Sequence, residues 1–292
     1  MEFTTVPCHE SLRPFIYNYW VMNADCTSRG TQTMFSNGAA NLQFYLSQPI
    51  APLGSDKHHK TILFHLEMKS IDLVTEPGPV NIFGVEFVFF CSRLFFRKEF
   101  QGDYQTPEQL GDDEFVEVCR RVHDASNMDE RVKLLDDFFL KRLAELPAED
   151  VNLMRLQHVF DEIVPVDGSV APPPVNHDDF LPSDLASAAC LSQKQFTRVF
   201  NKYMGMNPKT YLRLLRFHRA LRELQQADEK TLLTDVAYSC GYYDLPHMTA
   251  DFNDICGFSP SQLKDNRSGL TETFGTDFNI LMRKKIKVEN LI

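Results

Sequence analysis

Short stretches rich in aromatic and β-branched residues follow one another through the front part of the chain. They cover residues 16–22, 41–47, 61–68 and 81–90. Turn formers such as Ser-Asn-Gly at 36–38 and Glu-Pro-Gly-Pro at 76–79 separate them. Runs of this kind predict β-strands. Several short strands with turns between them are typical of a β-sandwich or barrel.

Helical periodicity replaces this pattern further along the chain. In residues 130–146 the apolar positions recur every three or four residues, as in an amphipathic helix. This stripe consists of Val132, Leu135, Phe139, Leu143 and Leu146. We expect it either to be buried in its own domain or to form a dimer contact. A second helix is predicted over 151–164, and three consecutive prolines at 172–174 predict an irregular segment after it.

Two segments of the helical region 181–267 share one layout. In each, a short helix leads through a turn to a residue suited to cap a second helix, Ser192 in the first and Asp244 in the second. Apolar residues follow four and eight positions after each cap. They are Phe196 and Phe200 in the first segment and Met248 and Phe252 in the second. This spacing predicts two helix-turn-helix units whose second helices are anchored on one face and free on the other.

The free face of the first unit carries polar and cationic side chains at three- and four-residue steps. They are Lys194, Thr197, Arg198 and Asn201. Lysine and arginine can donate to guanine O6 and N7, and an α-helix fits the major groove of DNA. Ser192 and the backbone N–H groups at the start of the same helix are suited to hold a phosphate.

A long helix is predicted over residues 208–226, between the two units. Its apolar face consists of Leu214, Phe217, Leu221 and Leu224. Arg213, Arg216, Arg219 and Arg222 follow a three-residue step, which spreads them over half of the circumference. We interpret these arginines as a solvated helix face. The alternative is that they bring positive charge close to a DNA backbone.

These positions together resemble the AraC/XylS family of bacterial transcription regulators, whose DNA-binding domain is two helix-turn-helix units joined by a long helix. The matching elements are Leu185-Ala186, Leu191-Ser192, Phe196, Arg198, Phe200, Gly205-Met-Asn-Pro208, Tyr211, Asp235-Val236-Ala237, Cys240-Gly-Tyr-Tyr-Asp244, His247, Phe252 and Gly257-Phe-Ser-Pro260. The front half resembles a sensor domain that precedes such DNA-binding domains. The elements that carry this second resemblance include Leu12-Arg-Pro-Phe15, Ser36-Asn-Gly38 and Phe83-Gly-Val-Glu-Phe87.

Pattern and resemblance together predict an α+β chain. Residues 1–147 are expected to form a β-rich sensor or dimerisation domain, a cupin-like barrel or sandwich with helices. Residues 150–267 are expected to form an all-α DNA-binding domain of two helix-turn-helix units joined by a long helix, with an irregular proline-rich loop at 165–180. Residues 268–292 would be a C-terminal tail. The expected DNA contacts are Ser192, Gln193, Lys194, Thr197, Arg198, Asn201, Lys202, Tyr243, His247 and Thr249.

The second unit departs from the family pattern at positions that would read bases. Leu245, Pro246 and Ala250 stand where the family commonly has polar residues and an arginine. Asp251 and Asp254 add negative charge. We therefore expect the first unit to supply most of the sequence specificity. The second unit would contribute packing, a few phosphate contacts or a surface for a protein partner. For His247 in this unit, packing within the domain is the alternative to a phosphate contact.

Charge is distributed unevenly along the 292 residues. The chain has 30 Lys and Arg and 40 Asp and Glu residues, for a formal net charge of −10. This average argues against a uniformly basic nucleic-acid binder. Residues 1–177 carry 15 basic and 26 acidic side chains, residues 181–222 carry 8 and 1, and residues 223–267 carry 3 and 8. The positive charge is thus concentrated on the first unit and the connecting helix.

Other function classes find little support. The 7 cysteines are odd in number and lack CxxC spacing, which is typical of reduced thiols in a cytosolic protein. There is no membrane-length apolar stretch and no secretory signal. His58 and His59 are adjacent and His65 has no second ligand set, so a metal-dependent cupin enzyme is not indicated. Cys8 lacks the cysteine partner that methyl-transferring DNA-repair relatives carry, and nucleotide-binding or nucleophile-elbow motifs are absent.

We therefore expect a bacterial, cytoplasmic transcription regulator that is not an enzyme and uses no cofactor. Its expected partners are double-stranded DNA, a small-molecule effector, RNA polymerase and a second copy of the chain, with no membrane. A ligand or partner at the front domain would change dimerisation or the orientation of the two domains. The alternative is a protein-interaction co-regulator whose degenerate helix-turn-helix does not bind DNA specifically.

Overall fold

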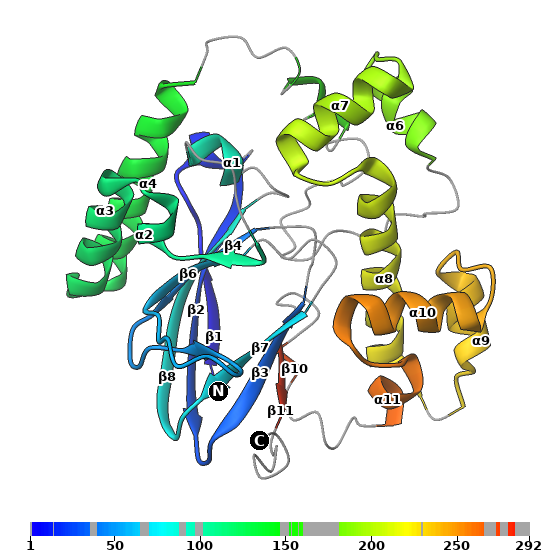
Figure 1. The fold of residues 1–292 in the computed structure, drawn as a ribbon, viewed down its shortest axis with the longest axis horizontal. Helices are drawn as coiled ribbons and strands as arrows, with labels where there is room; N and C mark the ends of the chain where they lie inside the picture. Colours follow the sequence, from blue (N-terminus) through cyan, green and yellow to red (C-terminus); the bar gives the residue numbers. More distant parts are fainter. Residues whose placement is uncertain are drawn as a thin grey trace.

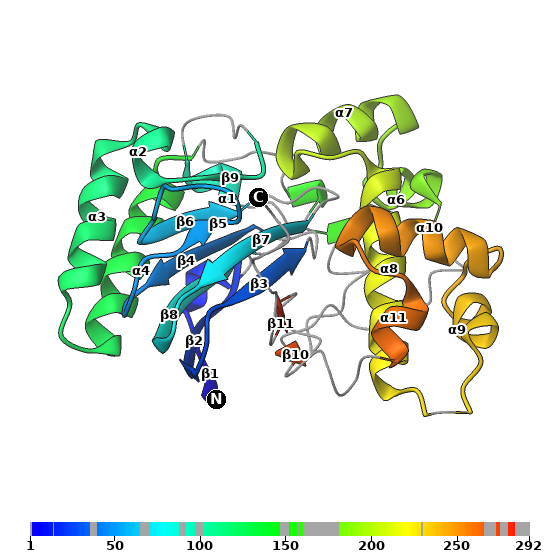
Figure 2. The same ribbon diagram turned by 60° about the horizontal axis from the view of Figure 1, so that its bottom comes forward.

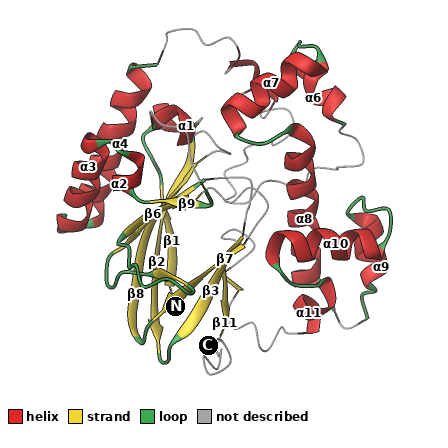
Figure 3. Ribbon diagram, in the orientation of Figure 1, coloured by secondary structure: helices red, strands yellow, loops and turns green. Residues whose placement is uncertain are grey.

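A β-rich part and a helical part make up the molecule (Figures 1 and 3). The computed structural model describes residues 2–13, 15–35, 40–64, 70–87, 92–96, 102–146, 152, 154–156, 158–159, 181–228, 230–265, 273–274 and 280–283. The β-rich part is built mainly from the first half of the chain, and the helical part from residues 181–265. The expected α+β class is confirmed.

Two antiparallel sheets form the β-rich part. The larger sheet contains, in order, β1 (Glu2–Val6), β2 (Ile16–Cys26), β8 (Gly78–Phe87), β4 (Asn41–Tyr45), β6 (Thr61–Phe64) and β9 (Tyr104–Gln105). The smaller sheet contains β10 (Thr273–Phe274), β11 (Ile280–Arg283), β3 (Gly30–Phe35), β7 (Ser70–Thr75) and β5 (Ala51–Pro52). Since β11 pairs with β3, part of the expected C-terminal tail extends a sheet of the front domain.

Alternation of side chains along the strands divides the apolar core of the β-rich part in two. Trp20, Ile82 and Leu73 belong to a cluster between the two sheets. Phe44 and Phe83 point to the opposite face of the larger sheet and join a second cluster beneath the helices. Successive residues of a strand face opposite sides, so each long strand contributes to both clusters. This arrangement agrees with the expected sandwich-like domain.

Helices cover the outer face of the larger sheet (Figure 2). They are α1 (Ser92–Phe95), α2 (Pro107–Leu110), α3 (Asp113–Asp124) and α4 (Met128–Ala144), and a short 3-10 helix, Glu10–Leu12, lies beside α4. Helix α4 confirms the helix expected over 130–146. Leu135 and Phe139 of its apolar stripe are buried, and Val132 and Leu143 pack half-buried against the same core. The stripe is therefore used mainly within its own domain.

The helical part contains the two predicted helix-turn-helix units. Its helices are α6 (Pro182–Ala188), α7 (Gln193–Met204), α8 (Pro208–Gln226), α9 (Leu233–Ser239), α10 (Leu245–Cys256) and α11 (Pro260–Asp265). Ser192 and Asp244 are the N-caps of α7 and α10, as the sequence predicts. Gly205 and Gly257 end these two helices in the left-handed conformation that glycine adopts readily.

The four predicted strands lie at the expected places in the chain, but the observed strands begin or end at different residues. The structure adds β1, β3, β7, β5 and β9, which the local sequence did not reveal because pairing within the sheets stabilises them. The predicted strand ends at 65–68 and 88–90 lie outside the described residues, as do the loop 165–180 and most of the tail. Of the helix expected over 151–164, the described residues Asn152, 154–156 and 158–159 are helical.

Six cysteines lie within the described residues. They are free thiols, and four of them are buried. Burial raises the pKa of Cys8 to about 11 and that of Cys240 to about 12, so both thiols are protonated at neutral pH. In the part of the chain that the structure describes, we find no helix with the length and apolar composition of a membrane span.

A glycine on β8 creates the space that the single tryptophan occupies. Trp20 on β2 pairs with Gly84 on β8, and a Cβ atom at Gly84 would overlap the indole ring. We expect Gly84→Ala to lower the free energy of unfolding by about 1–3 kcal/mol through overpacking. Chemical denaturation measures this loss. In the double variant Gly84→Ala/Trp20→Leu the two effects should not add, because the smaller side chain relieves the overlap; strict additivity would contradict the packing argument.

Candidate nucleic-acid interface

The start of α7 is held by a reciprocal capping arrangement. The Gln195 backbone N–H donates to Ser192 Oγ at 3.4 Å, and the Ser192 N–H donates to Gln195 Oε1 at 3.2 Å. The Ser192 hydroxyl also donates to Gln195 Oε1 at 2.8 Å. Because this hydroxyl is already engaged, the first contribution of Ser192 is to set where α7 begins. A phosphate contact by the same hydroxyl would have to compete with Gln195.

One face of α7 is buried and the opposite face is exposed. Phe196 and Phe200 have no solvent-accessible surface, whereas Lys194 and Arg198 are exposed. Neither of these two cations forms a hydrogen bond or ion pair within the described part of the chain. Two long cationic side chains one turn apart are therefore free to bind an external acceptor. This is the arrangement that the helical spacing predicts.

The other expected contacts on α7 differ in how free they are. Gln193 and Asn201 are exposed. The Thr197 hydroxyl donates to the Gln193 carbonyl at 2.9 Å, so its methyl group is the part left for a base. Lys202 turns back onto the domain, because its Nζ donates to Tyr203 Oη at 3.1 Å and lies 4.7 Å from the centre of that ring.

The second unit presents a different set of side chains at the start of α10. Tyr243 is 84% exposed in the turn before the helix. His247 is half-buried, with its ring edge-on to Tyr242 at 5.3 Å between ring centres. The Thr249 hydroxyl donates to the Leu245 carbonyl at 2.9 Å and is used within the helix. Of the three expected contacts here, Tyr243 is the most accessible and His247 partly fulfils the packing alternative.

The N-terminal ends of α7 and α10 point away from the β-rich part, and their C-terminal ends lie beside it (Figures 1 and 2). The guanidinium group of Arg93 on α1 lies directly against Gly205 at the end of α7. At the end of α10, Gly257 approaches Ser70 of β7, with 3.9 Å between Ser70 Oγ and the Cβ position of Gly257. The front domain therefore leaves the N-terminal halves of both helices uncovered.

Three arginines of α8, Arg213, Arg216 and Arg219, are not the solvated face that the sequence suggested. Arg213 Nε donates to Asp251 Oδ1 at 2.5 Å, and its Nη2 donates to Asp254 Oδ2 at 2.6 Å. Arg216 Nη2 lies 3.7 Å from Asp251 Oδ2, and Arg219 Nε lies 3.7 Å from Glu223 Oε1. These three side chains are half-buried in ion pairs within the domain. For Arg213 and Arg216 the interpretation failed because their partners lie far away in sequence. For Arg219 the partner lies one turn along the same helix.

The same ion pairs compensate negative charge that the acidic residues add to α10. Asp251 is only 3% exposed and faces α8, so its charge is compensated inside the domain. The guanidinium group of Arg216 also lies over the ring of Tyr242, 4.9 Å from its centre. Burial and the nearby Asp251 carboxylate both raise the pKa of Tyr242. The cluster of Arg213, Arg216, Asp251 and Tyr242 fixes α10 against α8, and neither helical periodicity nor spacing reveals it.

Known proteins share the layout of this helical part. Residues 185–266 match the family described as a helix-turn-helix domain. The transcriptional regulator ArgR of Pseudomonas aeruginosa is 28% identical over 100 residues, which cover 34% of this chain and 30% of that protein. The transcriptional activator RhaS of Pectobacterium carotovorum is 32% identical over 80 residues, covering 27% and 28%. The matched segment thus spans about 30% of the length of these curated relatives.

Two solved structures show a weak likeness to this chain. The match to ToxT from Vibrio cholerae O395 covers 85% of this chain and 98% of the ToxT chain, at 13% identity and a TM-score of 0.43. The match to the DNA-binding domain of AdpA, solved with a target DNA, covers 41% of this chain and 96% of the AdpA chain, at 22% identity and a TM-score of 0.31.

The C-terminal domain is a helix-turn-helix domain of the AraC type. The family matched by residues 185–266 and the regulators ArgR and RhaS establish this class, and the resemblance stated from the sequence is confirmed. Among the described residues, no group of three or more His, Cys, Asp or Glu side chains is placed to hold a metal ion.

The ion pairs on α10 predict unequal effects for two neighbouring aspartates. Asp251→Ala leaves two half-buried arginines without their shared partner, and we expect the helical domain to lose about 1–3 kcal/mol of stability. Asp254 binds the same Arg213, but its side chain is 63% exposed. Asp254→Ala should therefore cost less than about 0.5 kcal/mol. Urea denaturation followed by circular dichroism compares the two variants, and equal losses would disprove the role of Asp251.

Proposed function

We propose that this protein is a sequence-specific DNA-binding transcription regulator in which the first helix-turn-helix unit reads the bases. The observation that carries the proposal is the exposed face of α7. Lys194 and Arg198 lie there without partners among the described residues, in a domain of the AraC type. In such units the N-terminal part of the second helix contacts base edges in the major groove. Lys194, Thr197 and Arg198 would read bases, with Gln193 and Asn201 beside them.

The second unit would contribute contacts to the DNA backbone rather than base reading. Tyr243, His247 and Thr249 are the candidates, and Tyr243 is the one whose ring is most accessible. The internal pairing of Asp251 supports such a contact, because its charge is not presented to a phosphate. Asp254 remains largely exposed, so some repulsion persists. Ser192 would orient α7 through its cap, and Lys202 would reach a phosphate by leaving Tyr203.

The front domain, residues 1–147, would sense an effector or mediate dimerisation, with residues 150–267 as the DNA-binding domain and 268–292 as a tail. Regulators such as ArgR and RhaS support a regulatory role rather than an enzymatic one. A small-molecule effector, RNA polymerase and a second copy of the chain are the proposed partners besides DNA. We place the protein in the cytoplasm, where its DNA target would lie.

A second candidate is a co-regulator that binds another protein instead of DNA. The formal net charge of −10 favours it, because an acidic molecule is repelled by DNA at long range. Binding through several phosphates weakens steeply as salt is added, because condensed counterions are released from the DNA. A retardation assay at several salt concentrations therefore separates the two candidates. A co-regulator would retard no DNA even at low salt.

Arg198→Ala tests the proposed base reading. Duplexes selected from a random pool by the parent protein supply the binding site, and selection is repeated with the variant. We expect the preference at one base step to fall by about 1–3 kcal/mol, or about tenfold or more, while general affinity falls less. Arg120→Ala, an exposed arginine on α3, is the matched control and should leave the selected site unchanged. Identical selected sites for Arg198→Ala and the parent would disprove base reading by Arg198.

Ala250→Arg tests whether α10 approaches DNA. Ala250 is exposed on α10, six positions after the Asp244 cap. An added cation close to the backbone should tighten binding and steepen the slope of log Kd against log salt by about one. Ala144→Arg adds the same charge at an exposed position on α4 and serves as the control. If both variants change the slope equally, α10 does not lie at the DNA.

A further inference from the structure

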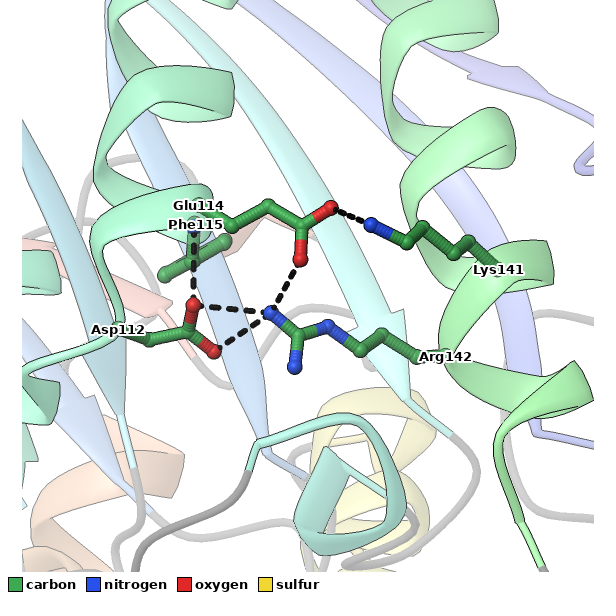
Figure 4. Close-up of polar contacts among 5 residues, drawn as sticks. All are labelled: Asp112, Glu114, Phe115, Lys141 and Arg142. Carbon is green, nitrogen blue, oxygen red and sulfur yellow. Dashed lines mark hydrogen bonds and ion pairs between the residues drawn. The ribbon is translucent and has the colours of Figure 1, made fainter.

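A cavity of about 460 Å³ lies where the end of α2 and the start of α3 meet α4. Its lining includes Phe96, Leu110, Asp112, Asp113, Glu114 and Arg142. It lies among the helices of the front domain and not between the two sheets, since Phe96, Leu110 and Phe115 belong to the cluster beneath the helices. Figure 4 shows the polar side chains at this place.

Arg142 of α4 is almost completely enclosed, with 3% of its side chain exposed. Its Nη2 donates to both oxygens of Asp112 at 2.8 Å and to Glu114 Oε2 at 3.0 Å. Asp112 also accepts the Phe115 N–H at 3.2 Å as the N-cap of α3. All three described hydrogen bonds of the guanidinium group thus leave from one nitrogen atom.

The other two nitrogen atoms of Arg142 are buried without an acceptor. Nε and Nη1 form no hydrogen bond with any described residue. In Figure 4, Nη1 points away from the two carboxylates. Phe138 lies against the group, 4.9 Å from its ring centre to Cζ, and offers no strong acceptor for these in-plane N–H groups. Arginine stays protonated in proteins and cannot relieve the deficit by losing a proton. An acceptor oxygen placed against Nη1 would satisfy it.

The charges around the cavity select the kind of molecule that carries this oxygen. Three carboxylates line the cavity, those of Asp112, Asp113 and Glu114, and two cations lie beside them, Arg142 and Lys141. Lys141 Nζ contacts Glu114 at 2.5 Å. One negative charge remains in excess, which disfavours an anion. A cation would leave the arginine N–H groups without an acceptor. A carboxamide is neutral, accepts through its oxygen and donates through its nitrogen to a carboxylate, and Phe96 and Leu110 offer an apolar wall.

We propose that this cavity is an effector site for a small neutral amide with an apolar body. The effector role rests on the proposed function. Phe96 directly follows α1, and α1 carries the Arg93 guanidinium group that lies against Gly205 at the end of α7. A molecule that moves Phe96 would therefore act on the element that contacts the reading helix. Phe96 also packs on Phe115 and Phe138, at 4.8 and 6.5 Å between ring centres.

Hexanamide is the probe, with hexanoate and hexylamine as charged molecules of the same chain length. Ligand-observed NMR with the full chain at neutral pH gives the three Kd values. We expect hexanamide to bind at least about tenfold more tightly than either charged molecule, as expected for one hydrogen bond to a charged group. Equal affinity for all three molecules, or preference for a charged one, would overturn the proposal.

Variants locate the binding to the cavity. Asp113 is exposed and lines the cavity, so Asp113→Trp should block it and reduce hexanamide binding by at least about tenfold. Glu117→Trp places the same side chain one turn further along α3, outside the lining, and should bind hexanamide like the parent. Arg142→Met removes the donors. Near-ultraviolet circular dichroism shows whether this variant folds. If it does not fold, the comparison of Asp113→Trp with Glu117→Trp decides whether hexanamide binds in the cavity. Unchanged binding by Asp113→Trp would overturn the site.

The effector role has a separate readout. Saturating hexanamide should change the DNA Kd of the parent and of Glu117→Trp by at least about fivefold, and that of Asp113→Trp by much less. Binding of hexanamide without any change in DNA affinity would overturn the effector role. If the parent binds no DNA specifically, the proposed function fails, while the NMR comparison of the variants still decides whether the cavity binds amides.

Discussion

The orientation of α7, the proposed reading helix, depends on two buried phenylalanines one turn apart. Phe196 and Phe200 lie 5.4 Å from each other between ring centres, and Phe200 packs on Tyr211 of α8 at 5.6 Å. Burying positions four residues apart leaves a helix only one rotation about its axis. Lys194 and Arg198 then face outward as a geometric consequence. The capping box at Ser192 sets where the helix starts, so rotation and register are determined together.

The second unit is held by charge as well as by packing. Phe217 and Phe252 stack edge to face at 4.7 Å, and beside them Asp251 binds the arginines of α8. A formal charge counts ionised groups, whereas the field outside the protein depends on which of them lack a partner nearby. The acidic composition of residues 223–267 therefore overstates the negative charge that α10 presents. Two units with the same layout are stabilised by different interactions.

The front domain touches α7 and α10 at their C-terminal ends. A cation at the C-terminus of a helix meets the partial negative charge of its last carbonyl groups, and Arg93 occupies that place at α7. Contact at this end leaves the proposed reading face exposed while joining it mechanically to α1. The aromatic side chains behind α1 continue this connection, since Phe95 packs on Phe139 of α4 at 4.9 Å. The domain interface thus links elements of the front domain to α7 without covering the exposed face of that helix.

Local sequence determined the helix-turn-helix units, their caps at Ser192 and Asp244, and the exposed cations of α7. These features depend on helical periodicity and on short-range hydrogen bonds, both of which are readable from neighbouring residues. Tertiary structure alone decided the partners of Arg213, Arg216 and Asp251, and it brought Arg142 to Asp112. It also placed residues 280–283 beside β3. Such contacts join positions far apart in the chain, where side-chain charge is visible in the sequence but distance is not.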